Sequence, residues 1–229
     1  MAGRQHTDLQ YENELKQLHR KILEMGGLVE KQITNAVRAL VEREDALANE
    51  TIQRDHTVNR LDVEIDDLCI RLLALHQPAA RDLRLITTAL KITTDLERIG
   101  DMAVNLCERV LELNQEPQLK PFIDIPRMAE IAQRMLRESL DAFVREDTEL
   151  ALEVCRTDDD IDDLTHQVFR ELLSYMAEDP QTIARAIRVI FVAKYIERIA
   201  DHSTNIAEMV VFMVKGKSIR HLDTVPGSL

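Results

Sequence analysis

Carboxylates recur four residues apart in this 229-residue chain. Glu97 and Asp101 form one pair, and Glu197 and Asp201 form a second pair with the same spacing. Residues four apart lie on the same face of a helix, so each pair places two acidic side chains together. Two like charges at this spacing repel by about 0.2–0.5 kcal/mol, which a bound cation would offset. Oxygen ligands of this kind suit hard cations such as Mg²⁺, Mn²⁺, Ca²⁺ or iron.

The second pair belongs to a longer internal repeat. Residues 95–105 align without gaps with residues 195–205, and five positions are identical. Shorter matches farther upstream keep a nearly constant offset and align Asp55 with Asp158. The chain is therefore predicted to be a tandem duplication of a unit of about 100 residues.

A denser acidic cluster occurs in the second copy. Residues 158–163 hold five aspartates, of which Asp158 and Asp162 form another pair four apart. The matching positions in the first copy are Asp55 and Asn59, a weaker pair because Asn59 is neutral. A helix that begins near residue 147 would contain this cluster in its interior, where the helix dipole does not stabilise it. Alternatively, a helix restarts at Thr157, which would cap it.

The elements that must position these side chains are long helices. Proline cannot continue a helix and restricts the residue before it, so the prolines mark boundaries: Pro78, Pro180 and the cluster Pro117, Pro121 and Pro126. The first copy then predicts helices near residues 8–43, 46–76 and 79–113. The second copy predicts helices near residues 124–145, 148–178 and 181–215.

Apolar residues recur at alternating spacings of three and four along the third helix of each copy, which is typical of a bundle seam. The sequence therefore predicts an all-α fold of two tandem antiparallel three-helix bundles. We expect the first bundle at residues 1–114, the second at 121–216 and a flexible tail at 217–229. Gly26 and Gly27 weaken the first helix and predict close packing or a kink there. On a helical wheel, the acidic pairs of the third helices lie opposite the apolar stripe.

Composition narrows the classes of function. With 41 acidic and 29 basic residues, the net charge of −12 disfavours nucleic acid as a ligand. Three dispersed cysteines without a Cys-x-x-Cys pair fit a reducing compartment, and no signal peptide or membrane-length apolar run is visible. We therefore expect a cytoplasmic protein. Phosphate-binding loops and nucleophile motifs are absent from the sequence, so we expect no enzymatic activity.

Three further hypotheses stay open at this point. A di-iron enzyme would need Glu-x-x-His motifs, and Asp163 to His166 is the nearest match. A metal-free scaffold would pair Arg98 with Asp101 and Arg198 with Asp201. Histidine phosphotransfer would use an exposed histidine among His56, His76, His166 and His202, the last of which could also support a metal ligand from beside Asp201.

Several motifs together resemble the PhoU family of phosphate-signalling regulators. Glu-Arg-Ile-Gly-Asp at 97–101 and Glu-Arg-Ile-Ala-Asp-His at 197–202 carry the resemblance, within duplicated helical halves. Gln-Pro at 77–78 and Tyr-Met at 175–176 before Asp-Pro at 179–180 are also similar to the family pattern. The similarity extends over nearly the whole chain.

The resemblance implies metal ions, with Mg, Mn, Fe or Zn as the options, bound by pairs of acidic motifs. Carried onto this chain, the site of the second copy comprises Asp158, Asp162, Glu197 and Asp201, and that of the first copy comprises Asp55, Asn59, Glu97 and Asp101.

The resemblance also implies a cytoplasmic homodimer that negatively regulates phosphate uptake. Such a protein couples the phosphate ABC transporter, through its ATPase subunit, to a sensor histidine kinase. It would reach the membrane only through these partners.

Overall fold

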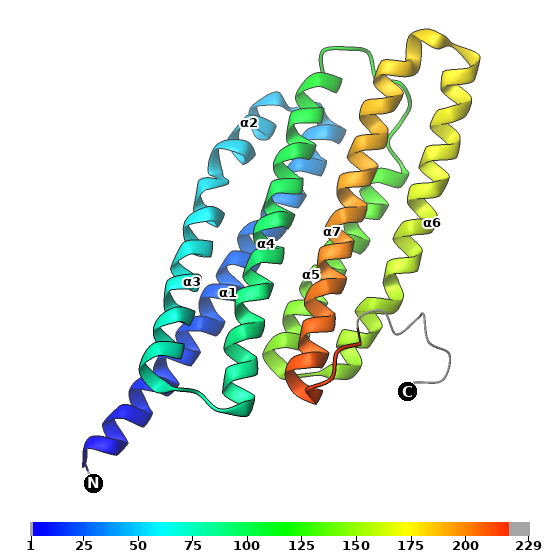
Figure 1. The fold of residues 1–229 in the computed structure, drawn as a ribbon. Coiled ribbons are helices and arrows are strands. Elements are labelled where there is room, and N and C mark those ends of the chain that lie inside the picture. Colours follow the sequence, from blue (N-terminus) through cyan, green and yellow to red (C-terminus); the bar gives the residue numbers. More distant parts are fainter. Residues whose placement is uncertain (1, 220–229) are drawn as a thin grey trace, which may run out of the picture.

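The computed structural model describes residues 2–219, with side chains from residue 9 onward, and every regular element in that range is a helix. The elements are α1 (Ala2–Glu42), α2 (Asp45–Arg54), α3 (His56–His76), α4 (Ala80–Leu113), α5 (Asp124–Arg145), α6 (Thr148–Glu178), η1 (Pro180–Thr182) and α7 (Ile183–Lys215). They run side by side along one long axis (Figure 1). The predicted all-α fold is confirmed, with α1 beginning earlier than expected. None of the helices in this range is long and apolar enough to cross a membrane.

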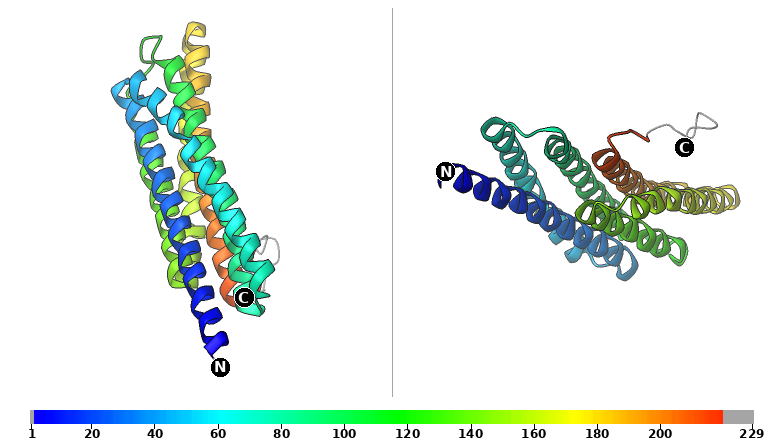
Figure 2. Two further views of the ribbon diagram at one scale, coloured as in Figure 1. Left: turned by 90° about the vertical axis from the view of Figure 1, so that its left-hand side faces the viewer. Right: turned by 90° about the horizontal axis from the view of Figure 1, so that it is seen from below.

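The helices form the two predicted tandem bundles, α1–α4 and α5–α7 (Figure 2). The two bundles meet mainly where α4 packs along α7, and α1 also contacts α5. Buried apolar side chains of both bundles merge into a single core. The proposed limits at 1–114 and 121–216 stay predictions, and the tail predicted at 217–229 lies mostly outside the described residues.

The predicted helix at 46–76 is wrong in one respect, because it breaks at Asp55 into α2 and α3. The Asp55 N–H donates to the Ile52 carbonyl at 3.3 Å, and the Val58 N–H donates to the Asp55 carbonyl at 2.8 Å. These bonds span three residues, as in a 3₁₀ turn, rather than the four of an α-helix. The backbone therefore tightens at Asp55.

The second copy has no such break, since α6 is continuous through its aspartates, as the span 148–178 predicts. Asp147 caps α6 by accepting hydrogen bonds from the Glu149 and Leu150 N–H groups at 3.0 and 3.1 Å. The alternative of a restart at Thr157 is wrong, because α6 is continuous there and the Thr157 hydroxyl donates to the Glu153 carbonyl within the helix. The last helix differs slightly from the predicted 181–215: a short 3₁₀ turn precedes it.

Gly26 lets α1 approach α5 closely. A Cβ atom on Gly26 would lie 2.3 Å from Cδ1 of Leu140, whereas one on Gly27 would meet nothing within 4 Å. The predicted close packing is therefore confirmed at Gly26, and α1 continues through both glycines without interruption.

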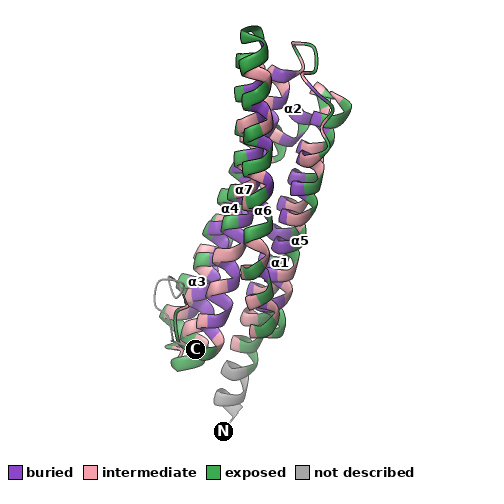
Figure 3. Ribbon diagram, turned by 90° about the vertical axis from the view of Figure 1, so that its right-hand side faces the viewer, coloured by how far each residue is buried: buried purple, intermediate pink, exposed green. Residues whose placement is uncertain are grey.

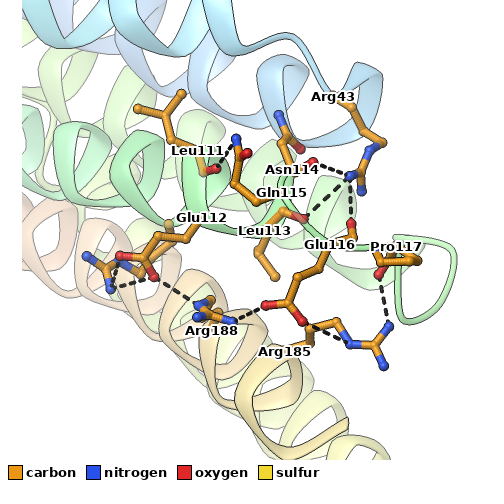
Figure 4. A network of polar contacts seen from close by, with 11 residues as sticks. Arg43, Leu111, Glu112, Leu113, Asn114, Gln115, Glu116, Pro117, Arg185 and Arg188 are labelled. Atoms are coloured by element: carbon orange, nitrogen blue, oxygen red, sulfur yellow. Dashed lines mark hydrogen bonds and ion pairs between the residues drawn. The ribbon is translucent and has the colours of Figure 1, made fainter. Parts of the chain in front are cut away.

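Ion pairs hold the C-terminal end of α4 and the first residues of the following loop, which joins the two bundles, against α7 (Figure 4). Arg188 donates to Glu112 at 3.0 Å and to Glu116 at 2.7 Å, which ties the end of α4 to α7. Arg43 donates to the carbonyls of Asn114 and Glu116, which lie at and beyond the C-terminus of α4. Cations near the last carbonyls of a helix also complement its dipole.

Candidate functional site

The predicted site residues gather in two outer grooves, one between α3 and α4 and the other between α6 and α7. We define the first carboxylate cluster as Asp55, Asp62, Glu97 and Asp101, and the second carboxylate cluster as Asp158, Asp162, Glu197 and Asp201. The members of each cluster perturb one another electrostatically. The prediction that the acidic pairs face solvent opposite the core is only partly right. Asp101 and Asp201 are exposed, whereas Glu97 is half-buried and the Glu197 side chain is only 13% exposed.

The second carboxylate cluster is the more strained electrostatically. Burial raises the pKa of Asp158 to about 6, and the charges of Asp201 and Asp162 add to this shift. Burial also raises the pKa of Asp201, with Glu197 and Asp162 acting in the same direction. Asp158 and Asp201 thus share a partly desolvated groove with the negative charges of Asp162 and Glu197.

One acidic side chain of the second cluster is only half satisfied. Lys194 donates to Oε1 of Glu197 at 2.5 Å. The other oxygen, Oε2, is buried and accepts no hydrogen bond from the described residues. A buried carboxylate oxygen without a partner is unfavourable unless a cation or water reaches it.

The first carboxylate cluster is organised around Asp55. Gln32 of α1 donates to Oδ1 of Asp55 at 3.0 Å, and Asn59 donates to Oδ2 at 2.9 Å. Both carboxylate oxygens are therefore bonded to neutral amides. Burial raises the pKa of Glu97, assisted by Asp101, Asp62 and Asp55, and burial with the charge of Asp55 raises the pKa of Asp101.

Sequence reasoning missed Asp62 and Gln32. A signal for Asp62 existed, because Asp55, Asn59, Asp62 and Asp66 follow at steps of four, three and four and so share one helical face. Burial raises the pKa of Asp62, and so does the charge of Asp66. Gln32 carried a weaker signal: it is a polar residue beside Ile33 in an otherwise apolar stripe.

The chemistry of both clusters fits a hard cation. All donors are oxygens, and Glu197 Oε2 is buried without a partner among the described residues. Zinc is the poorest fit of the expected metals, because no cysteine or histidine joins the carboxylates. As the described side chains lie, no three His, Cys, Asp or Glu residues are close enough to hold a metal ion. An ion would therefore bind only after some carboxylates rotate toward one another.

The sequence and fold agree with a known family. A family model described as the PhoU domain matches residues 22–110 and again residues 125–210. The chain belongs to the PhoU family. Relatives named phosphate-specific transport system accessory protein PhoU homolog include one from Pseudomonas putida, 41% identical over 95% of this chain and 85% of its own length. One from Aquifex aeolicus is 43% identical over 91% of this chain and 94% of its own length.

Solved PhoU structures share the fold. The crystal structure of PhoU from Pseudomonas aeruginosa superposes with a TM-score of 0.87 at 40% identity, covering 90% of this chain and all of that one. The phosphate transport system regulatory protein PhoU from Streptococcus pneumoniae gives a TM-score of 0.86 at 29% identity, covering 91% of this chain and 99% of that one. The family resemblance seen in the motifs is thereby confirmed.

The sequence suggested that His202 supports Asp201 as a metal ligand, but the structure places His202 elsewhere. Its side chain is buried, and Nδ1 lies 2.8 Å from Oδ1 of the buried Asp95 on α4. The pair therefore joins the two bundles. Asp95 was missed although it stands beside Leu96 in the apolar stripe of its helix.

The metal-free scaffold, di-iron and phosphotransfer interpretations stay hypotheses, and the structure shows where the residues that each one names lie. Among the described residues, Arg98 and Arg198 form no ion pair with Asp101 or Asp201; Glu197 pairs with Lys194, and the charge of Arg98 partly offsets the rise that burial causes in the pKa of Glu97. The carboxylates line outer grooves, whereas di-iron sites are built in the bundle core. His76 pairs with Glu14 at 3.1 Å, while His56 and His166 each bond a backbone carbonyl of their own chain segment.

Proposed function

We propose that this chain is a non-enzymatic negative regulator of phosphate uptake. In this role it couples the phosphate ABC transporter, through its ATPase subunit, to a sensor histidine kinase. The similarity to proteins named as accessory to phosphate-specific transport, over about 95% of the chain, is the observation that supports this role. The expected cytoplasmic location, homodimer and indirect membrane contact belong to the same proposal.

The shape of the molecule suits an adaptor. Helices of 31 to 34 residues present long, rigid faces (Figure 3). Such faces can bind helices of other proteins in their grooves. The packed α4–α7 interface and the ion pairs at the junction hold the two bundles in one arrangement.

Deletion of the gene in its host tests the regulatory role. In phosphate-rich medium, the deletion is expected to raise phosphate uptake and to activate a phosphate-starvation reporter, and the full chain should restore repression. Unchanged repression in the deletion strain would contradict the role. Recovery of neither transporter nor kinase with the chain, from replete or starved cells, would also count against it.

We further propose that the second carboxylate cluster binds a hard cation such as Mn²⁺ or iron, and that the first cluster binds it more weakly. Burial, and then repulsion between carboxylates, raises the pKa of Asp158 and Asp201; these shifts and the unpartnered Oε2 of Glu197 support binding in the second groove. Neutral Gln32 and Asn59 already satisfy Asp55, which supports weaker binding in the first. A bound ion would link the two helices that line its groove.

Elemental analysis after reconstitution with Mn²⁺ tests the metal sites. Glu197→Ala with Asp201→Ala should lower the bound manganese. The matched control, Glu153→Gln with Asp163→Asn, removes two exposed acidic charges of α6 that lie outside the defined cluster and should leave the stoichiometry unchanged. Equal manganese in all three proteins would refute the assignment.

A further inference from the structure

The groove between α6 and α7 continues past the second carboxylate cluster into an apolar hollow. Its volume is about 330 Å³, and Thr165, Phe169, Ile190 and Lys194 line it together with neighbouring side chains. Lys194 is also the residue that bonds Glu197, so the hollow and the cluster adjoin. The two helices lie side by side over this length (Figure 1).

Phe169 lines the hollow, and further large apolar side chains are exposed within about one helical turn of its lining residues on α6 and α7. Phe169 and Leu173 lie four apart on α6, and Ile187 and Phe191 lie four apart on α7, so each pair shares one helical face. Each of the four is between 42% and 47% exposed. A cluster of exposed apolar side chains is unfavourable in water and marks a surface that another molecule covers.

The fold does not require this apolar surface. At the matching positions of the first copy, Asp66 replaces Phe169, Thr87 replaces Ile187 and Lys91 replaces Phe191. Ile70 matches Leu173 and is itself 61% exposed, so the groove between α3 and α4 is polar at three of the four positions. The first bundle forms the same helices with polar side chains at the positions of Phe169, Ile187 and Phe191, so these three apolar side chains are not required for the fold.

The charges beside the hollow indicate what covers it. The second carboxylate cluster adjoins it through the bond between Lys194 and Glu197, and further aspartates of α6 at 159, 160 and 163 add negative charge to the same stretch of helix. The surface is thus apolar at one end and strongly anionic at the other. A helix with an apolar face and a basic end complements both parts.

We propose that the α6–α7 groove is a docking site for an amphipathic helix of a partner protein. Apolar residues of that helix pack on Phe169, Leu173 and Phe191, and its basic end faces the second carboxylate cluster. The inference rests on the adaptor role proposed above and names the surface and the kind of partner that this role needs.

The test uses the full chain and a designed fluorescent peptide of 15 residues, with leucines on one helical face and three lysines at one end. We expect the peptide to bind, and Phe169→Ser with Phe191→Ser to weaken binding at least about tenfold, because much of the buried apolar area is lost. The control, Leu75→Ser with Ile123→Ser, removes two side chains that are 64% and 74% exposed elsewhere and should change the affinity less than about twofold. Circular dichroism verifies that each variant is folded.

Several results would overturn the proposal. These are equal binding by a scrambled peptide of the same composition, equal binding by a peptide with glutamates in place of the lysines, or unchanged binding by the groove variant. A dimer that dissociates in the groove variant, measured by sedimentation, would show that a second copy of the chain covers the groove instead. Peptide binding needs neither phosphate nor transporter, so its failure is distinct from a failure of the deletion experiment.

Discussion

The two outer grooves place carboxylates at matching positions, but different side chains face them. In the first groove, amide groups of Gln32 and Asn59 bond both oxygens of Asp55. In the second, Met135 and Asp162 occupy the matching positions, so Asp158 has an added negative neighbour instead of an amide donor. Burial raises the pKa of Asp158 to about 6, and the charges of Asp201 and Asp162 add to the shift. Duplication kept the acidic pattern, while two substitutions changed its electrostatic balance.

The backbone differs in step with these side chains. The helix breaks at Asp55, where a side chain of α1 reaches the carboxylate, and it continues unbroken through Asp158. The contact between the copies is also unequal. Asp95 and His202 form a buried pair, whereas the matching residues of the other copy, Tyr195 and Met102, have no such chemistry.

The largest expected effect concerns this unequal contact. Asp95→Ala leaves His202 buried without its partner, and we expect the free energy of unfolding to fall by about 1–3 kcal/mol. The comparison is Tyr195→Phe at the matching position, which should change stability by less than about 0.5 kcal/mol. Urea unfolding measures both. Equal effects would show that the two third helices contribute alike to the interface.

The second prediction separates the grooves by their pH dependence, in the presence of EDTA. The pKa of Asp158 is about 6 in the folded chain, against an ordinary value of 3.8. The folded state therefore holds this proton more tightly than the unfolded state, and ionisation above pH 6 costs stability. As the pH falls from 7 through the folded pKa, the folded protein takes up this proton and the free energy of unfolding rises. The gain is complete below about pH 4, where the unfolded chain is protonated as well.

Asp158→Asn removes that dependence. The substitution should raise the free energy of unfolding at pH 7 by about 1 kcal/mol; this value is reduced for the solvent screening of a half-buried group. It should also make the free energy of unfolding nearly independent of pH between about pH 4 and 6. Asp163→Asn, at an exposed position of the same helix, should keep the wild-type curve. Urea titrations at a series of pH values measure this, and an unchanged slope for Asp158→Asn would contradict the pKa.

The third prediction converts the first groove toward the second. Asn59→Asp removes the hydrogen bond to Asp55 and adds a like charge, so the metal-free protein should lose about 0.5–1 kcal/mol. Mn²⁺ should stabilise this variant more than it stabilises the wild type. Thermal unfolding with and without Mn²⁺ measures both effects. Asp162→Asn in the second groove should have the opposite effects: the metal-free protein should become more stable, and Mn²⁺ should stabilise it less than it stabilises the wild type.

The smallest expected effect concerns α1. The second copy has Ala129 and Glu130 at the positions of Gly26 and Gly27. Gly27→Ala meets open space and should stabilise the chain by roughly 0.5 kcal/mol, since alanine loses less backbone entropy in a helix. Gly26→Ala is the control and should stabilise the chain less than Gly27→Ala, because its Cβ atom would force Cδ1 of Leu140 to move. Equal melting temperatures for the two variants would contradict the close packing of Gly26 against Leu140.

Sequence periodicity was a reliable guide where structure is local. The spans of α5 and α6 were predicted correctly, since prolines and apolar spacing mark them unambiguously. The break at Asp55 was missed because residues 51–58 contain no glycine or proline, and the helix tightens beside a side chain from α1. Helical spacing placed each acidic pair on one face of its helix, whereas the partial burial of these carboxylates depends on the facing helix.

The sequence by itself determined the helices, the duplication and the acidic faces, because each follows from spacing within a few turns of one helix. Only the tertiary structure decided which helices meet. It buried His202 against Asp95, brought Gln32 to Asp55, left Oε2 of Glu197 without a partner among the described residues and joined an apolar hollow to the second carboxylate cluster. These features depend on contacts between residues far apart in the chain, which helical periodicity does not encode.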